Sequence, residues 1–284
     1  MHEHDLGLGH DLRVMSRRRI LGALGLAGVA AAAACTTSTD TPATESTATT
    51  TPAAAPQETA GPYPGDGSNG PNVLIESGVV RSDITTSFGA YSGVAQGVPM
   101  ELTLNLYDLA LGAAGAGMAV YVWHCDREGG YSLYSEGVTE QNYLRGVQVA
   151  DETGTVHFTS IFPACYTGRW PHIHFEVYDS LTTAVAGDNA RLTSQIALPQ
   201  DACEAVFAAD PGYATSTRNL SGVTLSSDNV FGDGWDAELA TVTGTPTTTM
   251  TVSLTVGVAE KSQNTQSDNG SPGSDPPPGG APPR

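Results

Sequence analysis

Apolar and polar residues alternate in several short segments in the middle of the chain. In residues 101–107 (ELTLNLY), Leu102, Leu104 and Leu106 are separated by polar residues, as expected for a β-strand that buries one face. Further strands are predicted over residues 118–123, 144–149, 156–161, 172–178 and 249–258, with turns rich in Gly, Asp and Pro between them. The best candidate for a helix is the segment 201–209. Many short strands at this spacing predict an all-β fold, a β-sandwich with few short helices.

Both ends of the chain differ in composition from this middle region. Residues 36–57 (TTSTDTPATESTATTTPAAAPQ) are dominated by Thr, Ala and Pro, which cannot form a core, so we expect a linker there. Residues 259–284 end in GSPGSDPPPGGAPPR and are expected to be a disordered Gly/Pro-rich tail. The packed domain is therefore predicted to span residues 58–258, a size that suits a single β-sandwich.

Residues 1–35 have the features of an export signal. Arg17 and Arg18 precede an uncharged run over residues 20–34, which is shorter than the roughly 20 residues needed to cross a membrane. The paired arginines resemble a twin-arginine signal. The run ends in Ala32-Ala33-Ala34-Cys35, which resembles a lipobox, although Ala32 stands where leucine is usual. We expect a cell-surface lipoprotein that contacts the membrane only through a lipid on Cys35, or a secreted protein if the signal is simply cleaved.

The charge of the chain restricts its partners. The formal net charge is −18, and an acidic surface repels the phosphate backbone of nucleic acids. We therefore expect no nucleic-acid partner.

The most informative segment is Pro171-His172-Ile173-His174-Phe175 in one of the predicted strands. Residues two apart on a strand point to the same face, so His172 and His174 are expected to lie side by side. Such a pair alone is weak evidence, because it also occurs in zinc sites and on ordinary surfaces. Tyr166 and Arg169 precede the pair closely, and a glycine loop after the predicted strand over 118–123 presents Tyr131.

These motifs follow one another in a recognisable order. Trp123 and Tyr131 come first, then Leu144-Arg145-Gly146-Val147-Gln148, and then Phe162-Pro163, Tyr166, Arg169 and His172-Ile173-His174. Over roughly residues 58–255 this order resembles the intradiol ring-cleavage dioxygenases, in particular their exported, lipoprotein-like branch. Where that family often has Pro-Gly before the second tyrosine, this chain has Pro163-Ala164-Cys165.

The resemblance implies the fold, the site and the chemistry. It implies the β-sandwich of these dioxygenases, with one non-haem ferric ion, Fe(3+), held by Tyr131, Tyr166, His172 and His174. It also implies that Arg169 and Gln195 act in the active site and that a bound catechol displaces Tyr131 from the iron. The implied reaction opens a catechol-type ring between its two hydroxyl-bearing carbons with O2 and gives a muconate-type diacid. Phenolate is a hard anionic donor that suits ferric iron, as in the haem of catalase.

Two other kinds of protein remain open at this stage. One is a non-catalytic, exported β-sandwich binding module with a vestigial metal site. The other is a zinc or copper enzyme that uses the histidine pair together with Glu176. Tyr134 is an alternative to Tyr131 as a ligand, His124 is expected in the core or beside the ligands, and His157 is expected to be structural.

Three cysteines follow Cys35. An exported protein can form disulfides, and three cysteines leave one unpaired. We favour a bridge between Cys165 and Cys203, which would fix the loop that carries Tyr166; a bridge that uses Cys125 stays open.

Overall fold

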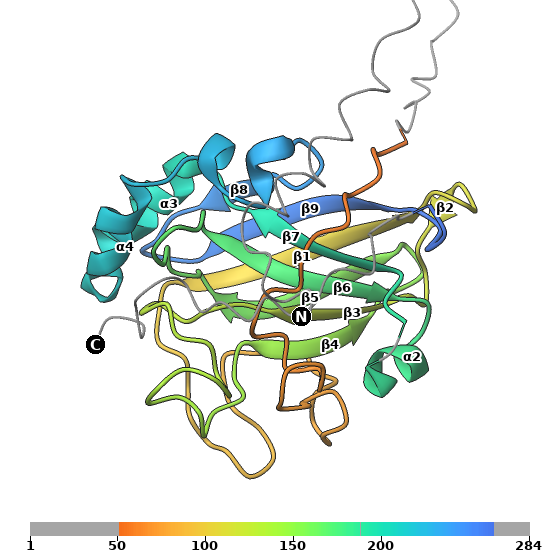
Figure 1. The fold of residues 1–284 in the computed structure, drawn as a ribbon, viewed down its shortest axis with the longest axis horizontal. Helices are drawn as coiled ribbons and strands as arrows, with labels where there is room; N and C mark the ends of the chain where they lie inside the picture. The colour runs from red at the N-terminus through yellow and green to blue at the C-terminus, as the bar shows by residue number, and fades with distance from the viewer. Residues whose placement is uncertain (1–50, 188, 264–284) are drawn as a thin grey trace, which may run out of the picture. The chain divides into compact units, whose positions relative to one another are not determined.

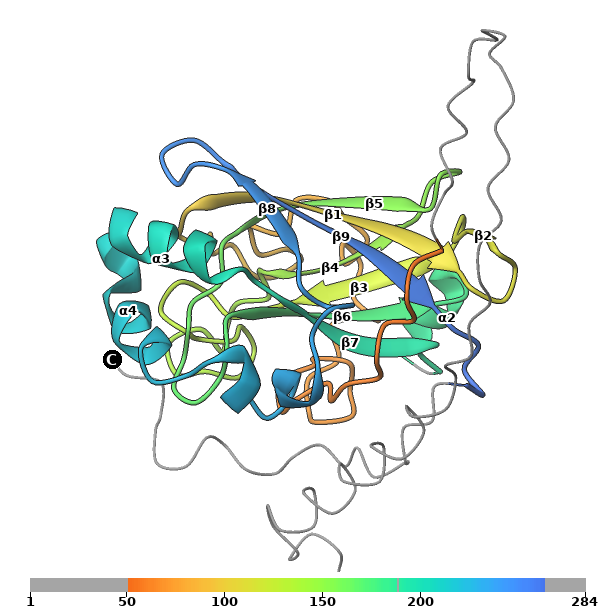
Figure 2. The ribbon, with the colours of Figure 1, turned by 90° about the horizontal axis from the view of Figure 1, so that it is seen from above.

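The computed structural model of the protein describes residues 51–187 and 189–263. Two β-sheets lie one above the other, with α3 and α4 near one end of the sheets and α2 near the other (Figures 1 and 2). The strands are β1 (Pro99–Asp108), β2 (Ala113–Ala114), β3 (Ala119–Trp123), β4 (Arg145–Val149), β5 (Thr155–Ile161), β6 (His172–Tyr178), β7 (Leu192–Ala197), β8 (Thr241–Gly244) and β9 (Met250–Val258). The helices are α2 (Leu181–Ala186), α3 (Gln200–Ala209) and α4 (Ala214–Leu220), and the short 3-10 turns are η3 (Pro211–Tyr213), η4 (Leu225–Ser227) and η5 (Phe231–Asp233).

The two sheets differ in strand direction. The five-stranded sheet has the order β2-β1-β9-β8, with β5 also paired to β1, and β1 and β9 run parallel. The four-stranded sheet has the order β4-β3-β6-β7, and each neighbouring pair is antiparallel. The chain therefore forms a β-sandwich, which confirms the predicted all-β fold.

Burial along the strands explains which of them the sequence predicts. In β1, residues Met100, Leu102, Leu104 and Leu106 are buried while their neighbours are more exposed, so the alternation is visible in the sequence. The sequence does not predict β7 (LTSQIA), which is buried on both faces although three of its residues are polar. The burial of Thr193, Ser194 and Gln195 depends on partners from distant segments, and such partners leave no pattern in the strand itself.

The predicted helix over 201–209 is confirmed as α3. Its buried residues Ala202, Cys203, Val206 and Phe207 recur at the spacing of one helix face. The sequence reading missed α2, which begins with a capping box between Ser180 and Thr183 and ends at Gly187 in the left-handed conformation, with φ of 70°. No helix within the described residues is long and apolar enough to cross a membrane.

The packed region begins before residue 58, the predicted start of the domain. Ala55 is buried, and its backbone N–H donates to the carbonyl of Gly257 at 2.9 Å. The Thr193 N–H donates to Oε1 of Gln57 at 3.0 Å. This part of the predicted linker therefore packs against the sandwich. The predicted signal, lipobox and first part of the linker (1–50) and most of the predicted tail (264–284) lie outside the described residues.

The favoured disulfide between Cys165 and Cys203 is wrong. Cys125, Cys165 and Cys203 are all free, buried thiols. Each thiol contacts a backbone carbonyl instead. Cys125 contacts the carbonyl of Ala164, Cys165 contacts that of Arg169, and Cys203 contacts that of Leu198. Cys165 is fixed by this local contact and by its N–H, which donates to Oγ of Ser216 at 3.0 Å.

Candidate metal centre

The candidate site is built on one face of the four-stranded sheet. Arg145, Trp123, His174 and Gln195 are register partners on β4, β3, β6 and β7, so they form one row across all four strands. On β6, His172 and His174 share this face, while Ile173 and Phe175 belong to the opposite, core face. All of β6 is buried. The histidine face is covered in part by residues 51–66, called the N-terminal segment below: Gly61 approaches the His174 ring, and the Thr59 carbonyl accepts from the amide of Gln195.

Four side chains converge on one point. The Nε2 atoms of His172 and His174 lie 3.1 Å apart. The Tyr131 hydroxyl lies 3.2 Å from Nε2 of His174, and the Tyr166 hydroxyl lies 3.2 Å from Nε2 of His172. The structure thus brings together the four residues that the sequence singled out as ligands, from β6 and from the two loops that precede β4 and β6.

These distances fit a single ion. Two ligand atoms at about 2.1 Å from one metal ion and at right angles to each other lie roughly 3 Å apart. The Nδ1–H of His172 donates to the carbonyl of Trp170 at 2.5 Å, which leaves the lone pair of Nε2 directed at the cluster. Burial, followed by the charge of Arg169, lowers the pKa of His172 well below its usual value. A neutral imidazole is the form that binds metal.

The two phenols need a cation in order to ionise. Burial, and then the proximity of Tyr166, raises the pKa of Tyr131 well above its usual value. Burial also raises the pKa of Tyr166, to about 12. A bound metal ion lowers the pKa of its ligands strongly, so a cation of high charge would turn both phenols into anionic donors. Two phenols and two neutral imidazoles therefore suit ferric iron as a donor set.

The zinc or copper alternative would require Glu176 beside the histidines. The carboxylate of Glu176 instead accepts hydrogen bonds from the Tyr178 hydroxyl at 2.7 Å and from Oγ1 of Thr193 at 3.1 Å. Within residues 51–187 and 189–263, no group of three or more His, Cys, Asp and Glu residues is arranged to hold a metal ion. The convergent set has only two such residues, and its other donors are tyrosines.

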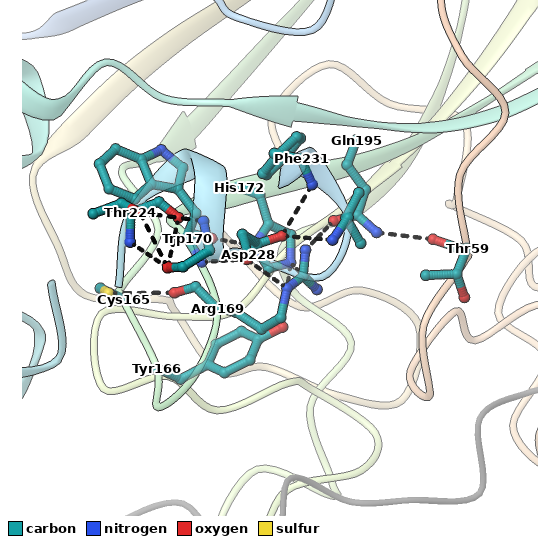
Figure 3. A network of polar contacts seen from close by, with 12 residues as sticks. Thr59, Cys165, Tyr166, Arg169, Trp170, His172, Gln195, Thr224, Asp228 and Phe231 are labelled. Carbon is teal, nitrogen blue, oxygen red and sulfur yellow. Dashed lines mark hydrogen bonds and ion pairs between the residues drawn. The ribbon is translucent and has the colours of Figure 1, made fainter. Parts of the chain in front are cut away.

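Arg169 and Gln195 both lie at the cluster (Figure 3). Nη1 of Arg169 lies 3.5 Å from Nε2 of His172, and Nη2 donates to Oε1 of Gln195 at 2.6 Å. The amide of Gln195 donates in turn to the carbonyl of Thr59 at 2.9 Å. The Nε of Arg169 donates to Asp228 at 2.9 Å, and this carboxylate is fully buried rather than a surface acid. No pattern in the sequence indicates a role for Asp228.

His174 is held differently from His172. Its Nδ1 is buried and has no hydrogen-bond partner among the described residues. Its ring instead stacks on the indole of Trp123, with centroids 4.9 Å apart and planes 5° apart. The backbone of Gly61, with φ of 70°, approaches the same ring so closely that an added Cβ would lie 3.3 Å from Cε1. A flat partner and a glycine thus replace the hydrogen bond that usually orients a metal-binding histidine.

Arg145 belongs to one of the motifs that carry the resemblance, but the sequence did not reveal what its side chain does. It is buried, and it donates to the carbonyls of Tyr63, Pro64 and Ser132 at 2.9, 2.8 and 3.0 Å. It also donates to the Tyr121 hydroxyl and to Oγ of Ser132, both at 3.1 Å. One side chain thus ties the N-terminal segment to the residue that follows Tyr131.

The other candidates from the sequence lie away from the cluster. The Tyr134 hydroxyl accepts a hydrogen bond from the Gly65 N–H at 2.9 Å. The two ring nitrogens of His124 contact the Cys125 carbonyl and Oγ of Ser160, both at 2.8 Å, so this histidine is a satisfied core residue. His157 contacts Oγ1 of Thr103 at 3.0 Å on the five-stranded sheet.

The fold and the cluster together define a β-sandwich protein with a candidate metal centre. A family model described as "Dioxygenase" matches residues 75–229, which is more than half of the chain. The chain belongs to the intradiol ring-cleavage dioxygenase family, whose members generally use non-haem Fe(III). The resemblance in the sequence is thereby confirmed at the level of the family.

Individual relatives are distant. A chlorocatechol 1,2-dioxygenase from Rhodococcus opacus is 36% identical over 67 residues, which are 24% of this chain and 26% of the relative. The match thus spans about a quarter of the length of that relative. The structure of an intradiol ring-cleavage dioxygenase from Tetranychus urticae matches with a TM-score of 0.56 and 23% identity, over 77% of this chain and 98% of that one. This second match supports the shared sandwich fold.

Proposed function

We propose that this protein is a non-haem Fe(III)-dependent intradiol dioxygenase that cleaves a catechol between its two hydroxyl-bearing carbons with O2. The observation that carries the proposal is the convergence of two tyrosyl oxygens and two histidyl nitrogens at 3.1–3.2 Å in a buried site. Ferric iron would supply a Lewis acid that binds a catechol and makes its ring reactive toward O2. A non-catalytic module would have no need to keep all four donors in this arrangement.

The proposed iron site has two rigid donors and two adjustable donors. His172 and His174 are fixed by β6, whereas Tyr131 and Tyr166 are held by loops. The Tyr131 ring is buried and packs against Tyr63, with centroids 5.0 Å apart. We propose that Tyr131 gives way to the substrate and that its Oη then accepts a proton from a catechol hydroxyl.

Arg169 would stabilise the negative charge that develops on the bound substrate. Nη1 of Arg169 lies 3.5 Å from Nε2 of His172. Burial disfavours the charge on Arg169, but Tyr166 and Asp228 outweigh this effect, so its pKa lies above its usual value. Arg169 therefore stays cationic. A fixed charge next to the reacting ring lowers the barrier by electrostatic preorganisation.

We propose that the substrate enters on the side of Tyr166. Tyr131, His172 and His174 are buried, whereas Tyr166 is only partly buried and the following residues 167 and 168 are exposed. A catechol would approach along this loop, while the N-terminal segment contacts His174, Gln195 and Tyr131. We also propose that the protein is exported by the twin-arginine route and anchored through Cys35, on the sequence of residues 16–35.

An oxygen-uptake experiment tests the proposal. The full chain is loaded with ferric iron and mixed with catechol, protocatechuate, hydroxyquinol and bulkier lignin-like catechols. We expect one O2 consumed per ring opened with at least one of them, a muconate-type absorbance, and no activity with zinc in place of iron. Iron-loaded protein that consumes no O2 with any catechol would contradict the proposal.

A further inference from the structure

The three nitrogens of the Arg169 guanidinium have different neighbours (Figure 3). Nε donates to Oδ2 of Asp228 at 2.9 Å, and Nη2 donates to Oε1 of Gln195 at 2.6 Å. Nη1 contacts the cluster, where it lies 3.5 Å from Nε2 of His172. Because the guanidinium is planar and rigid, fixing two of its nitrogens also fixes the direction of the third.

Asp228 is itself fixed from both sides. Its carboxylate is fully buried, and each of its oxygens accepts two hydrogen bonds. Oδ2 accepts from Nε of Arg169 and from the Trp170 N–H at 2.7 Å. Oδ1 accepts from the N–H groups of Val230 and Phe231 at 2.8 and 3.2 Å. This carboxylate thus joins the segment after η4 to the turn that leads into β6.

We propose that Asp228 is a positioning residue that aims Arg169 at the substrate site, an inference that rests on the proposed function. Asp228 and Gln195 hold the guanidinium between them, and Gln195 is held in turn by the Thr59 carbonyl of the N-terminal segment. Asp228 also holds the Trp170 N–H, and the Trp170 carbonyl accepts from Nδ1 of His172. The turn before His172 has a second support, because Nε1–H of Trp170 donates to the Leu198 carbonyl at 2.8 Å. The loss of the Asp228 carboxylate is therefore expected to affect Arg169 more than His172.

An amide cannot replace this carboxylate. All four neighbours of Asp228 are N–H donors, two at each oxygen. An asparagine would direct its NH2 group at one of these two pairs of donors in either orientation. In Asp228→Asn, an amide that keeps its oxygen toward the Val230 and Phe231 N–H groups would place its NH2 group against Nε of Arg169 and the Trp170 N–H. The side chain of Arg169 can move more easily than the backbone of Trp170, so the guanidinium would turn away from its present direction.

A double-mutant cycle tests the inference on the iron-loaded full chain with catechol. The variants are Asp228→Asn, Arg169→Ala and the two combined. We measure kcat and KM by O2 uptake, the Kd of catechol without O2, the iron content and the Tm.

We expect Asp228→Asn to lower kcat by about 10- to 100-fold at unchanged iron content, since a small misplacement of a catalytic group has effects of this size. Adding Asp228→Asn to Arg169→Ala should change kcat by less than about threefold, because the cation that Asp228 aims is already absent.

Asp108→Asn is the matched control. Asp108 is also buried, pairs with an arginine, Arg191, at 2.8 Å, and accepts from two backbone N–H groups of the following turn. It lies at the end of β1, on the other sheet. Asp108→Asn should lower the Tm as Asp228→Asn does, while kcat and the Kd of catechol stay at their wild-type values.

The outcomes separate the two proposals. Wild-type kcat and Kd in Asp228→Asn, or losses that multiply with those of Arg169→Ala, would overturn the positioning role while leaving the dioxygenase proposal intact. If iron-loaded wild-type protein opens no catechol, the proposed function fails, and the Kd of catechol across the same cycle then decides the positioning role. If Asp228→Asn does not fold, Asp228→Ser, which leaves space for water at the four donors, takes its place with the same expectations.

Discussion

The indole of Trp123 lies face to face with the imidazole of His174, with ring centroids 4.9 Å apart and planes 5° apart. The Trp123 N–H is buried and has no acceptor among the described residues, so the indole contributes its flat surface rather than a hydrogen bond. Since Nδ1 of His174 also has no partner among those residues, this stack, together with the close approach of Gly61, holds the ring in its orientation.

We predict that Trp123→Leu weakens iron binding. Loss of a group that orients a metal ligand costs roughly 10- to 100-fold in affinity, and a leucine offers no flat surface. Trp123→Phe, which keeps a ring, should lose less. The measurement is the rate at which a chelator removes iron. Phe158→Leu, a buried substitution in β5, controls for general destabilisation. Equal rates in Trp123→Leu and Phe158→Leu would show that the stack has no effect on the ligand.

We predict that the iron-loaded protein absorbs visible light through tyrosinate-to-iron charge transfer and that the two proposed tyrosine ligands differ. Tyr166→Phe should reduce both the absorption and the iron content. Tyr131→Phe should shift the band while more iron stays bound, since this ligand is expected to leave when catechol binds. Tyr134→Phe serves as the control, because its hydroxyl contacts the Gly65 N–H and not the cluster. If the band were lost in Tyr134→Phe but kept in Tyr131→Phe, Tyr134 and not Tyr131 would be the ligand.

The pH dependence of stability should show the effect of Glu238. This residue is buried, its Oε2 has no hydrogen-bond partner among the described residues, and burial raises its pKa to about 9. The folded protein therefore keeps a proton that the unfolded chain releases near pH 4–5. The contribution of Glu238 to the free energy of unfolding consequently falls as the pH rises from about 4.5 toward 9.

Glu238→Gln removes this proton release. We expect a Tm several degrees above that of the wild type at pH 8 and a difference close to zero at pH 4. Thermal unfolding of both proteins between pH 4 and pH 8 measures it. A difference that does not change over this range would mean that Glu238 does not titrate as its burial implies.

The proposed anchor is tested by fractionation. Cells that express the full chain should carry the protein in the detergent phase after phase separation, and Cys35→Ser should move it to the aqueous phase. The expectation follows from Arg17-Arg18 and the alanine run that ends at Cys35. If both forms partition alike, the protein has no lipid on Cys35.

The sequence predicts those parts of the fold and site that depend on local patterns. Alternation in residues 101–107 predicts β1, and the spacing of His172 and His174 places both on one face of β6. The order of motifs supplies the two tyrosines. The pairing of Arg169 with Asp228 could not be predicted, because these residues are 59 positions apart and meet only after the segment around η4 and η5 packs against the turn before β6. The cysteine pairing failed for a different reason: each thiol contacts a backbone carbonyl, and the number and spacing of the cysteines do not reveal such a contact.

Two of the four proposed donors lie on a strand and two on loops, and this difference affects how such proteins can diversify. The histidines belong to a strand inside a sheet, where an insertion would disturb every neighbouring strand, whereas both tyrosines belong to loops, which tolerate changes in length and sequence. Descendants of one ancestor can therefore reshape the approach to the proposed site for new substrates and inherit the histidine strand unchanged.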